Sequence, residues 1–103
     1  MRTFSLKTLR EFWESGHPDA ELGLRGWYGK TAKAEWDNFS ELRTTFRSAD
    51  AVGEKVVFNI SRNEYRLIAY VNYEYKQVLV KFIGTHADYS RLSKREIENL
   101  CAT

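Results

Sequence analysis

The stretch KVVFNISRNEYRLIAYVNYEYKQVLVKFIGTHADY, from Lys55 to Tyr89, decides the fold class of this chain of 103 residues. It contains three segments, residues 55–60, 65–72 and 77–85, that are rich in β-branched and aromatic side chains and alternate in polarity. The connections between them, SRNE and YEYK, are as short as those of hairpins. The stretch therefore predicts three strands paired as an antiparallel meander, alone or within a slightly larger sheet.

The alternation also sorts the strand residues onto two faces, because neighbouring side chains of a strand point to opposite sides. One face is apolar almost throughout and is expected to pack against helices: Val56, Phe58, Ile60, Tyr65, Leu67, Ala69, Val71, Val78, Val80 and Phe82. On the opposite face, apolar residues that include Ile83 are interrupted by Lys55, Asn59, Arg66 and Lys81. A solvated face of an antiparallel sheet accommodates polar residues, which accounts for Lys55 and Asn59.

Arg66 is harder to explain as a solvated residue, since it lies in the middle strand between apolar neighbours. By this alternation no carboxylate of the three strands shares its face, so Arg66 is expected to need an anion from elsewhere. The alternatives are a phosphate group, a carboxylate of a partner protein, and Glu96 or Glu98 of the terminal segment.

The residues before the strands are predicted to form helices. Residues 5–15 place their large apolar side chains at helical spacing, and Gly16 and Pro18 then end the helix. Residues 19–34 predict a second helix, and residues 38–46 predict a short third helix with a capping-box sequence at its start.

The predicted second helix contains Gly23, Gly26 and Gly29. Each glycine disfavours a helix by about 1 kcal/mol relative to alanine. Their spacing alternatively allows the helix to pack closely against a neighbouring element. Both interpretations stay open at the level of sequence.

A short terminal helix is predicted over residues 93–101. The order of elements is then helices, strands and a helix, without a linker or repeat. This order predicts an α+β fold, with the N-terminal helices packed on a small antiparallel sheet, and a single domain over residues 1–103.

The composition favours a small protein of a reducing cytosol. Hydrophobic residues make up 43% of the chain, but no apolar run approaches the about 20 residues of a membrane span. The N-terminus lacks the apolar stretch of a signal peptide, and the single Cys101 cannot form an internal disulfide.

The only histidines, His17 and His86, have no partners at metal-ligand spacing, so neither a metal nor a cofactor is predicted. The net charge is +2, and its excess lies in residues 53–103, a weak indication of an anionic partner.

The third strand ends in GTHADY, which brings an imidazole and a phenol close together. Gly84 is expected to end or bend the strand. The unperturbed pKa of histidine, about 6.5, suits His86 to proton transfer near neutrality, although a histidine after a strand more often makes a hydrogen bond in a turn. Asp88 either orients that imidazole or starts a helical turn. Beside the cations of the sheet, His86 and Tyr89 become candidates for a catalytic pair.

These residues resemble the HigB-type toxins of bacterial type II toxin–antitoxin systems. The resemblance is carried by VVFNI, N-x-Y-R-L-I and F-I-G-T-H-x-x-Y, and upstream by LREFWE, PDAE, WY and KAEW. It implies a RelE-like toxin fold and a metal-independent endoribonuclease that cleaves mRNA, often on the ribosome. It also implies a HigA-like helix-turn-helix antitoxin, through which alone operator DNA is bound.

The resemblance implies roles for individual residues as well. Arg66 matches the arginine of the central strand that grips the scissile phosphate, and His86 and Tyr89 match the C-terminal pair that assists proton transfer. Lys81 is expected to help stabilise charge on the phosphate. The residues expected to bind RNA are Lys55, Asn59 and Arg62. A non-catalytic module that holds RNA or a protein through the same basic face is the alternative function.

Overall fold

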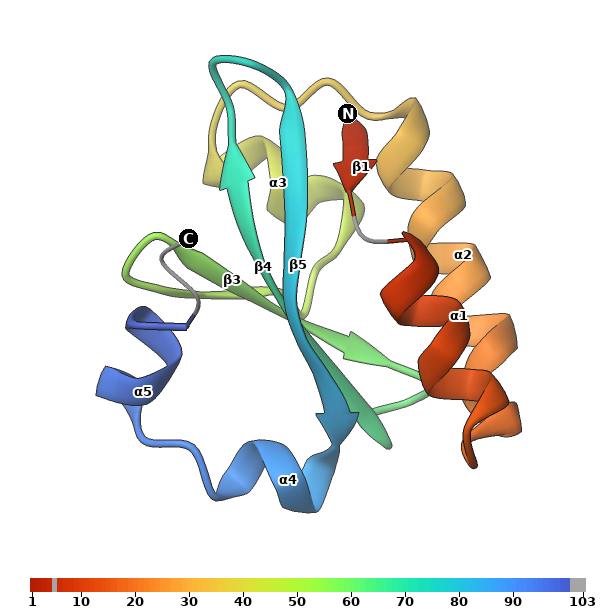
Figure 1. Ribbon diagram of the computed structural model, residues 1–103. Helices are drawn as coiled ribbons and strands as arrows, with labels where there is room; N and C mark the ends of the chain where they lie inside the picture. Colours follow the sequence, from red (N-terminus) through yellow and green to blue (C-terminus); the bar gives the residue numbers. More distant parts are fainter. Residues whose placement is uncertain (5, 101–103) are drawn as a thin grey trace.

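The computed structural model describes residues 1–4 and 6–100. The chain passes through the following elements (Figure 1): β1 (Arg2–Phe4), α1 (Leu6–Glu14), the 3₁₀ helix η1 (Pro18–Ala20), α2 (Glu21–Lys33), α3 (Phe39–Thr45), β2 (Asp50–Val52), β3 (Lys55–Ile60), β4 (Tyr65–Asn72), β5 (Gln77–Thr85), α4 (His86–Ser90) and α5 (Lys94–Glu98).

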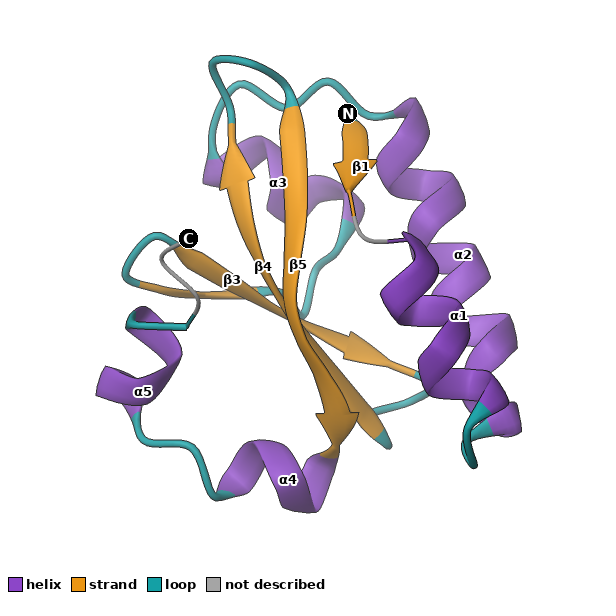
Figure 2. Cartoon of the chain, in the orientation of Figure 1, coloured by secondary structure: helices purple, strands orange, loops and turns teal. Residues whose placement is uncertain are grey.

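The α+β fold and the antiparallel meander of β3, β4 and β5 are confirmed, with the predicted strand bounds. Within the described residues the sheet has five strands in the order β1-β5-β4-β3-β2, and it is strongly twisted (Figure 2). The sequence did not predict the two edge strands. β1 pairs parallel with β5, and β2 pairs antiparallel with β3. Each has 3 residues, too few to display an alternation.

Both faces of the sheet are covered. α1 and α2 lie side by side on one face, as Figure 1 shows, and their buried residues Leu9, Trp13, Leu24 and Trp27 join the predicted apolar face in one core. On the other face, Ile97 of α5 closes a smaller cluster with Val52, Val57 and Ile68, against which Phe82, Tyr89, Leu92 and Leu100 pack. This second face, which carries Arg66, is thus only partly open.

The predicted positions of Phe82 and Ile83 are wrong, because β5 contains a bulge. Ile68 of β4 pairs with Phe82, whereas the next residue, Ala69, pairs with Val80, so Lys81 is an extra residue. One extra residue exchanges the faces of all residues that follow it. Phe82 therefore packs in the smaller cluster, and Ile83 packs against the main core.

The short helices differ in detail from their predictions. α3 has Asn38 as its N-cap, whose side chain accepts from the Glu41 amide at 2.9 Å. The Glu41 carboxylate accepts from the amide of Asp37 at 2.9 Å, one residue earlier than in a standard capping box. α5 begins after the N-cap Ser93, as predicted. It ends at Glu98, with Asn99 as its C-cap, so the predicted helix over residues 99 and 100 is wrong, and Cys101 lies outside the described residues.

No helix in residues 1–4 and 6–100 combines the length and the apolar character that a membrane crossing needs.

Candidate active site

Arg66 lies near the start of β4, on the face covered by the smaller cluster. In the sheet register its neighbours are Asn59 of β3 and Gly84 of β5. The side chain is half-buried, and its Nη1 donates to the carbonyl of Asn63 at 2.8 Å and to that of Tyr65 at 3.3 Å. Two backbone carbonyls therefore aim the guanidinium.

No carboxylate forms an ion pair with Arg66 among the residues that the structure describes. Glu96 caps the start of α5 by accepting from the amide of Ser93, and the carbonyl of Glu98 accepts from Lys55. The structure thus gives no support to a counter-ion from α5. A phosphate or a partner's carboxylate remains as the anion that Arg66 would meet.

Tyr89 supplies an aromatic surface for this arginine. Its ring centre lies 5.6 Å from the guanidinium carbon of Arg66, within the range of a cation–π interaction. The tyrosine is half-buried and also packs against the smaller cluster, so its ring is fixed from two sides.

His86 is exposed and is the first residue of α4. Its backbone amide donates to the carbonyl of Glu64 at 3.0 Å, which joins α4 to the turn between β3 and β4. Asp88 and Thr85 cap the helix reciprocally. Of the two predicted roles of Asp88, the structure therefore shows the helical one, and the carboxylate does not bond to the imidazole.

Ser90, which the sequence did not single out, is the residue that contacts the His86 imidazole. Its Oγ donates to the carbonyl of His86 at 2.8 Å and lies 3.3 Å from Nδ1. A hydroxyl has one proton, so once the carbonyl receives it, Oγ can only accept from Nδ1–H. This arrangement favours the tautomer with an unprotonated Nε2, the form in which histidine acts as a base. The spacing of four residues on a helix was the available signal.

Of the two expectations for Gly84, an end of the strand is wrong, because β5 continues to Thr85 and Gly84 pairs with Arg66. A Cβ at Gly84 would lie 2.7 Å from Cζ of Phe82 and 3.3 Å from Cβ of Asp88. Because Gly84 has no Cβ, the Phe82 ring has room beside the cross-strand pair of Gly84 and Arg66.

The remaining predicted residues are more scattered. Lys81 is half-buried at the bulge in β5, between the residues that pair with Ile68 and Ala69, and Arg62 is exposed in the turn after β3. Asn59 is the cross-strand neighbour of Arg66. It also lines a hollow of ≈ 270 Å³ beside α2.

Lys55 lies apart from this group. It begins β3, four positions from Asn59, or about 13 Å along a strand. Its side chain is 7% exposed, and Nζ donates to the carbonyl of Glu98 at 3.0 Å. A cation at this place complements the carbonyl end of α5. In this structure Lys55 therefore fastens the terminal helix to the sheet.

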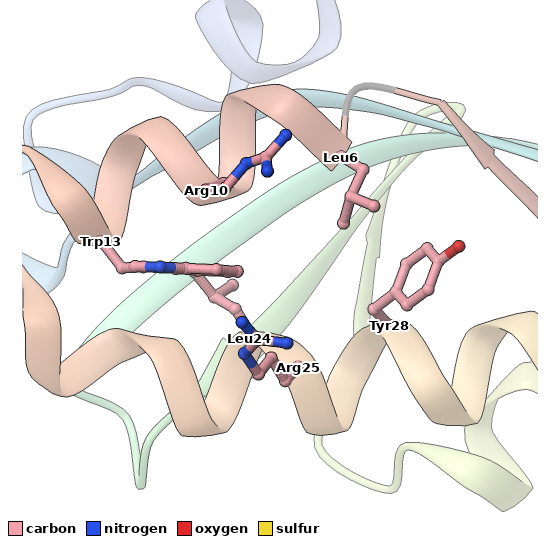
Figure 3. A pocket seen from close by; sticks show the side chains of 6 residues that line it. All are labelled: Leu6, Arg10, Trp13, Leu24, Arg25 and Tyr28. Atoms are coloured by element: carbon pink, nitrogen blue, oxygen red, sulfur yellow. The ribbon is translucent and has the colours of Figure 1, made fainter.

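A separate hollow of ≈ 260 Å³ lies between α1 and α2, on the far side of the sheet from Arg66. Figure 3 shows its lining: Leu6, Arg10, Trp13, Leu24, Arg25 and Tyr28. The guanidinium of Arg25 lies 5.1 Å from the Trp13 ring and pairs with Glu21 at 2.7 Å. Two arginines therefore border a mainly apolar hollow.

Within the described ranges, no three His, Cys, Asp or Glu side chains gather closely enough to hold a metal ion.

Known proteins share sequence features with this chain over most of its length. Residues 20–92 match a family described as HigB toxin, the RelE-like toxic component of a toxin-antitoxin system, which defines the class of protein. The chain is also 30% identical over 86 residues to the mRNA interferase HigB of Escherichia coli O6:H1, covering 81% of this chain and 84% of that protein. This chain belongs to the HigB toxin family.

Proposed function

We propose that this protein is an endoribonuclease that cleaves mRNA and thereby inhibits translation and growth, in keeping with the name of its E. coli relative. One observation carries the proposal. The guanidinium of Arg66, without an ion-pair partner in the described residues, lies against the Tyr89 ring, and His86 is tied to the turn that aims Arg66. We infer that Arg66, Tyr89 and His86 together offer a cation, a phenol and an imidazole to one phosphate.

The reaction needs no metal, because RNA provides its own nucleophile, the 2′-hydroxyl. A base removes the proton of that hydroxyl, cations stabilise the charge that develops on the phosphate, and an acid protonates the departing 5′-oxygen. We assign the charge stabilisation to Arg66 and Lys81. His86 acts as the base or the acid, and Tyr89 stacks on a base of the RNA or shares the proton transfer.

Asn59 and Arg62 are proposed to position the RNA, because both lie near Arg66 in the sheet register or in the adjoining turn. That Lys55 contacts RNA stays a prediction. It would require the ammonium to leave the carbonyl of Glu98, on which it rests in this structure.

Product analysis tests the proposal. Purified protein is incubated with mRNA, with and without ribosomes, and the new ends are examined. We expect a 2′,3′-cyclic phosphate on the upstream fragment, and loss of cleavage by about 10²-fold or more in Arg66→Ala. Arg47→Ala, which removes an exposed arginine outside the site, is the matched control. Intact RNA that is nevertheless retained by the protein would favour the non-catalytic binding module.

The family is one component of a toxin-antitoxin system, so an antitoxin is its partner. We propose a HigA-like antitoxin with a helix-turn-helix domain, which alone contacts operator DNA. We further propose that the toxin acts on mRNA at the ribosome, in the bacterial cytoplasm.

We propose that an acidic segment of the antitoxin covers Arg66 and Lys81. Hydrogen–deuterium exchange of the complex should then show protection in β4, β5 and α4. Protection confined to α1 and α2, around the hollow with Arg10 and Arg25, would contradict this position and require indirect inhibition.

A further inference from the structure

The turn between β3 and β4 has an unusual backbone. Ser61, Arg62 and Asn63 have φ values of 53°, 55° and 75°, so three successive residues with side chains adopt the left-handed conformation. That conformation is disfavoured for residues that carry a Cβ, and it persists only where the surrounding structure holds it. Something outside the turn is therefore expected to brace it.

This turn holds both candidate catalytic residues through adjacent carbonyl groups. The carbonyl of Asn63 accepts from Nη1 of Arg66 at 2.8 Å. The next carbonyl, of Glu64, accepts from the amide of His86 at 3.0 Å. A shift of the turn would consequently move the guanidinium and the imidazole together.

The brace comes from α2. A Cβ placed on Gly23 would lie 2.5 Å from Oγ of Ser61, 2.9 Å from Cγ2 of Ile60 and 3.1 Å from the backbone nitrogen of Ser61. The helix thus presses its own backbone onto the first residue of the turn, an approach that a side chain would prevent. A methyl group added at Gly26 or Gly29 of the same helix would meet nothing within 4 Å, which sets Gly23 apart.

A second contact fixes the other end of the turn. Tyr65 follows the turn directly, and its hydroxyl donates to Oδ1 of Asp19, in η1 just before α2, at 2.6 Å. The tyrosine is only 5% exposed. Contacts from η1 and from the start of α2 therefore hold the turn at both of its ends.

We propose that Gly23 is a positioning residue for RNA cleavage: it sets the turn at residues 61–64 and, through the carbonyls of Asn63 and Glu64, the relative places of Arg66 and His86. This role rests on the proposed nuclease activity and extends it to a residue on the opposite face of the sheet. Close packing, the second interpretation of the glycine spacing, thus applies to Gly23 alone among the three glycines of α2.

The chain contains its own controls, because Gly26→Ala and Gly29→Ala make the same substitution in the same helix without a contact. We expect Gly23→Ala to lower kcat by about tenfold or more with KM changed less than about twofold, since misplacing catalytic groups by about 1 Å has effects of up to 10²-fold. The two control variants should stay within about twofold of the unmodified protein in both constants. Thermal melting is measured for all four proteins.

A direct readout separates this role from the proposed function. The amide of His86 bonds to the turn, so its NMR chemical shift should move in Gly23→Ala and stay in place in Gly26→Ala. Unchanged kcat together with an unchanged His86 amide would overturn the positioning role. If the unmodified protein cleaves no RNA, the nuclease proposal fails, whereas the amide shift still tests whether Gly23 sets the turn.

A second comparison applies if Gly23→Ala does not fold. The double variant Gly23→Ala/Ser61→Gly lacks the Oγ that the new methyl group meets first, and it is compared with Ser61→Gly alone. The methyl group would still lie 3.1 Å from the backbone nitrogen at position 61, so the double variant should have the lower kcat and a shifted His86 amide. Equal kcat and equal shifts in the two variants would overturn the proposal.

Discussion

The guanidinium of Arg66 lies 5.6 Å from the ring centre of Tyr89, and two backbone carbonyls accept hydrogen bonds from it. The ring of Tyr89, rather than its hydroxyl, makes this contact. Tyr89→Phe should therefore keep cleavage within about threefold, whereas Tyr89→Ala should lower it about tenfold or more by freeing the guanidinium. Cleavage rates on a single RNA substrate provide the measurement. A large loss in Tyr89→Phe would instead give the phenol a part in proton transfer.

His86→Gln should lower cleavage by about 10²-fold or more, because glutamine retains hydrogen bonding but cannot transfer the proton. Because His86 is exposed, the substitution should leave the fold intact, which circular dichroism of the variant tests. Full activity in His86→Gln would contradict the role of His86 in proton transfer but would leave the nuclease proposal intact.

Ser90→Ala should lower cleavage by a smaller factor, about three- to tenfold, because the imidazole loses the acceptor that holds the proton on Nδ1. Ser15→Ala is a suitable control, since Ser15 also donates from an exposed position to a backbone carbonyl, that of Phe12 at 3.3 Å. Both variants lose a comparable hydrogen bond, but only Ser90→Ala should change the rate. Equal rates in the two variants would mean that Ser90 does not select the tautomer.

Tyr65 should make the protein sensitive to alkali. Its hydrogen bond to Asp19, together with burial and the nearby charges of Asp19 and Glu64, raises its pKa from 10.0 to about 12. The folded state therefore keeps a proton that the unfolded state loses, so this contribution to stability is complete below pH 10.0 and is lost as the pH rises towards about 12.

Denaturant unfolding between about pH 9 and pH 12 measures this effect. Tyr65→Phe should be less stable than the unmodified protein near neutral pH, by about 1 kcal/mol for the lost hydrogen bond, and should lose less stability as the pH rises. Tyr75→Phe, at a side chain that is 68% exposed, should retain the full alkaline loss. An identical pH dependence in Tyr65→Phe would contradict the raised pKa.

Local sequence patterns were sufficient to predict the three central strands, but not the features of the sheet that are defined by how strands pair. The strands over residues 55–60, 65–72 and 77–85 were predicted because alternation and short polar turns are local signals. The bulge at Lys81 was not predictable in this way, since an extra residue is defined only against the partner strand.

The same distinction holds for the site. Arg66 was singled out because it is a cation between apolar neighbours in the middle strand, and the structure places it beside Tyr89. The burial of Lys55 under Glu98 and the brace at Gly23 join residues far apart in sequence, for which no spacing rule exists.

The pairing of β1 with β5 has a consequence for how the chain folds. Short turns join β3, β4 and β5, so their pairing closes small loops, whereas Arg2 must find Gln77 across most of the chain. Until β1 docks, β5 is an edge strand whose free backbone groups can pair with another molecule. The pairing of β1 therefore covers an edge of β5 through which molecules could otherwise associate. Weakening this pairing should lead to aggregates before it leads to unfolded monomers.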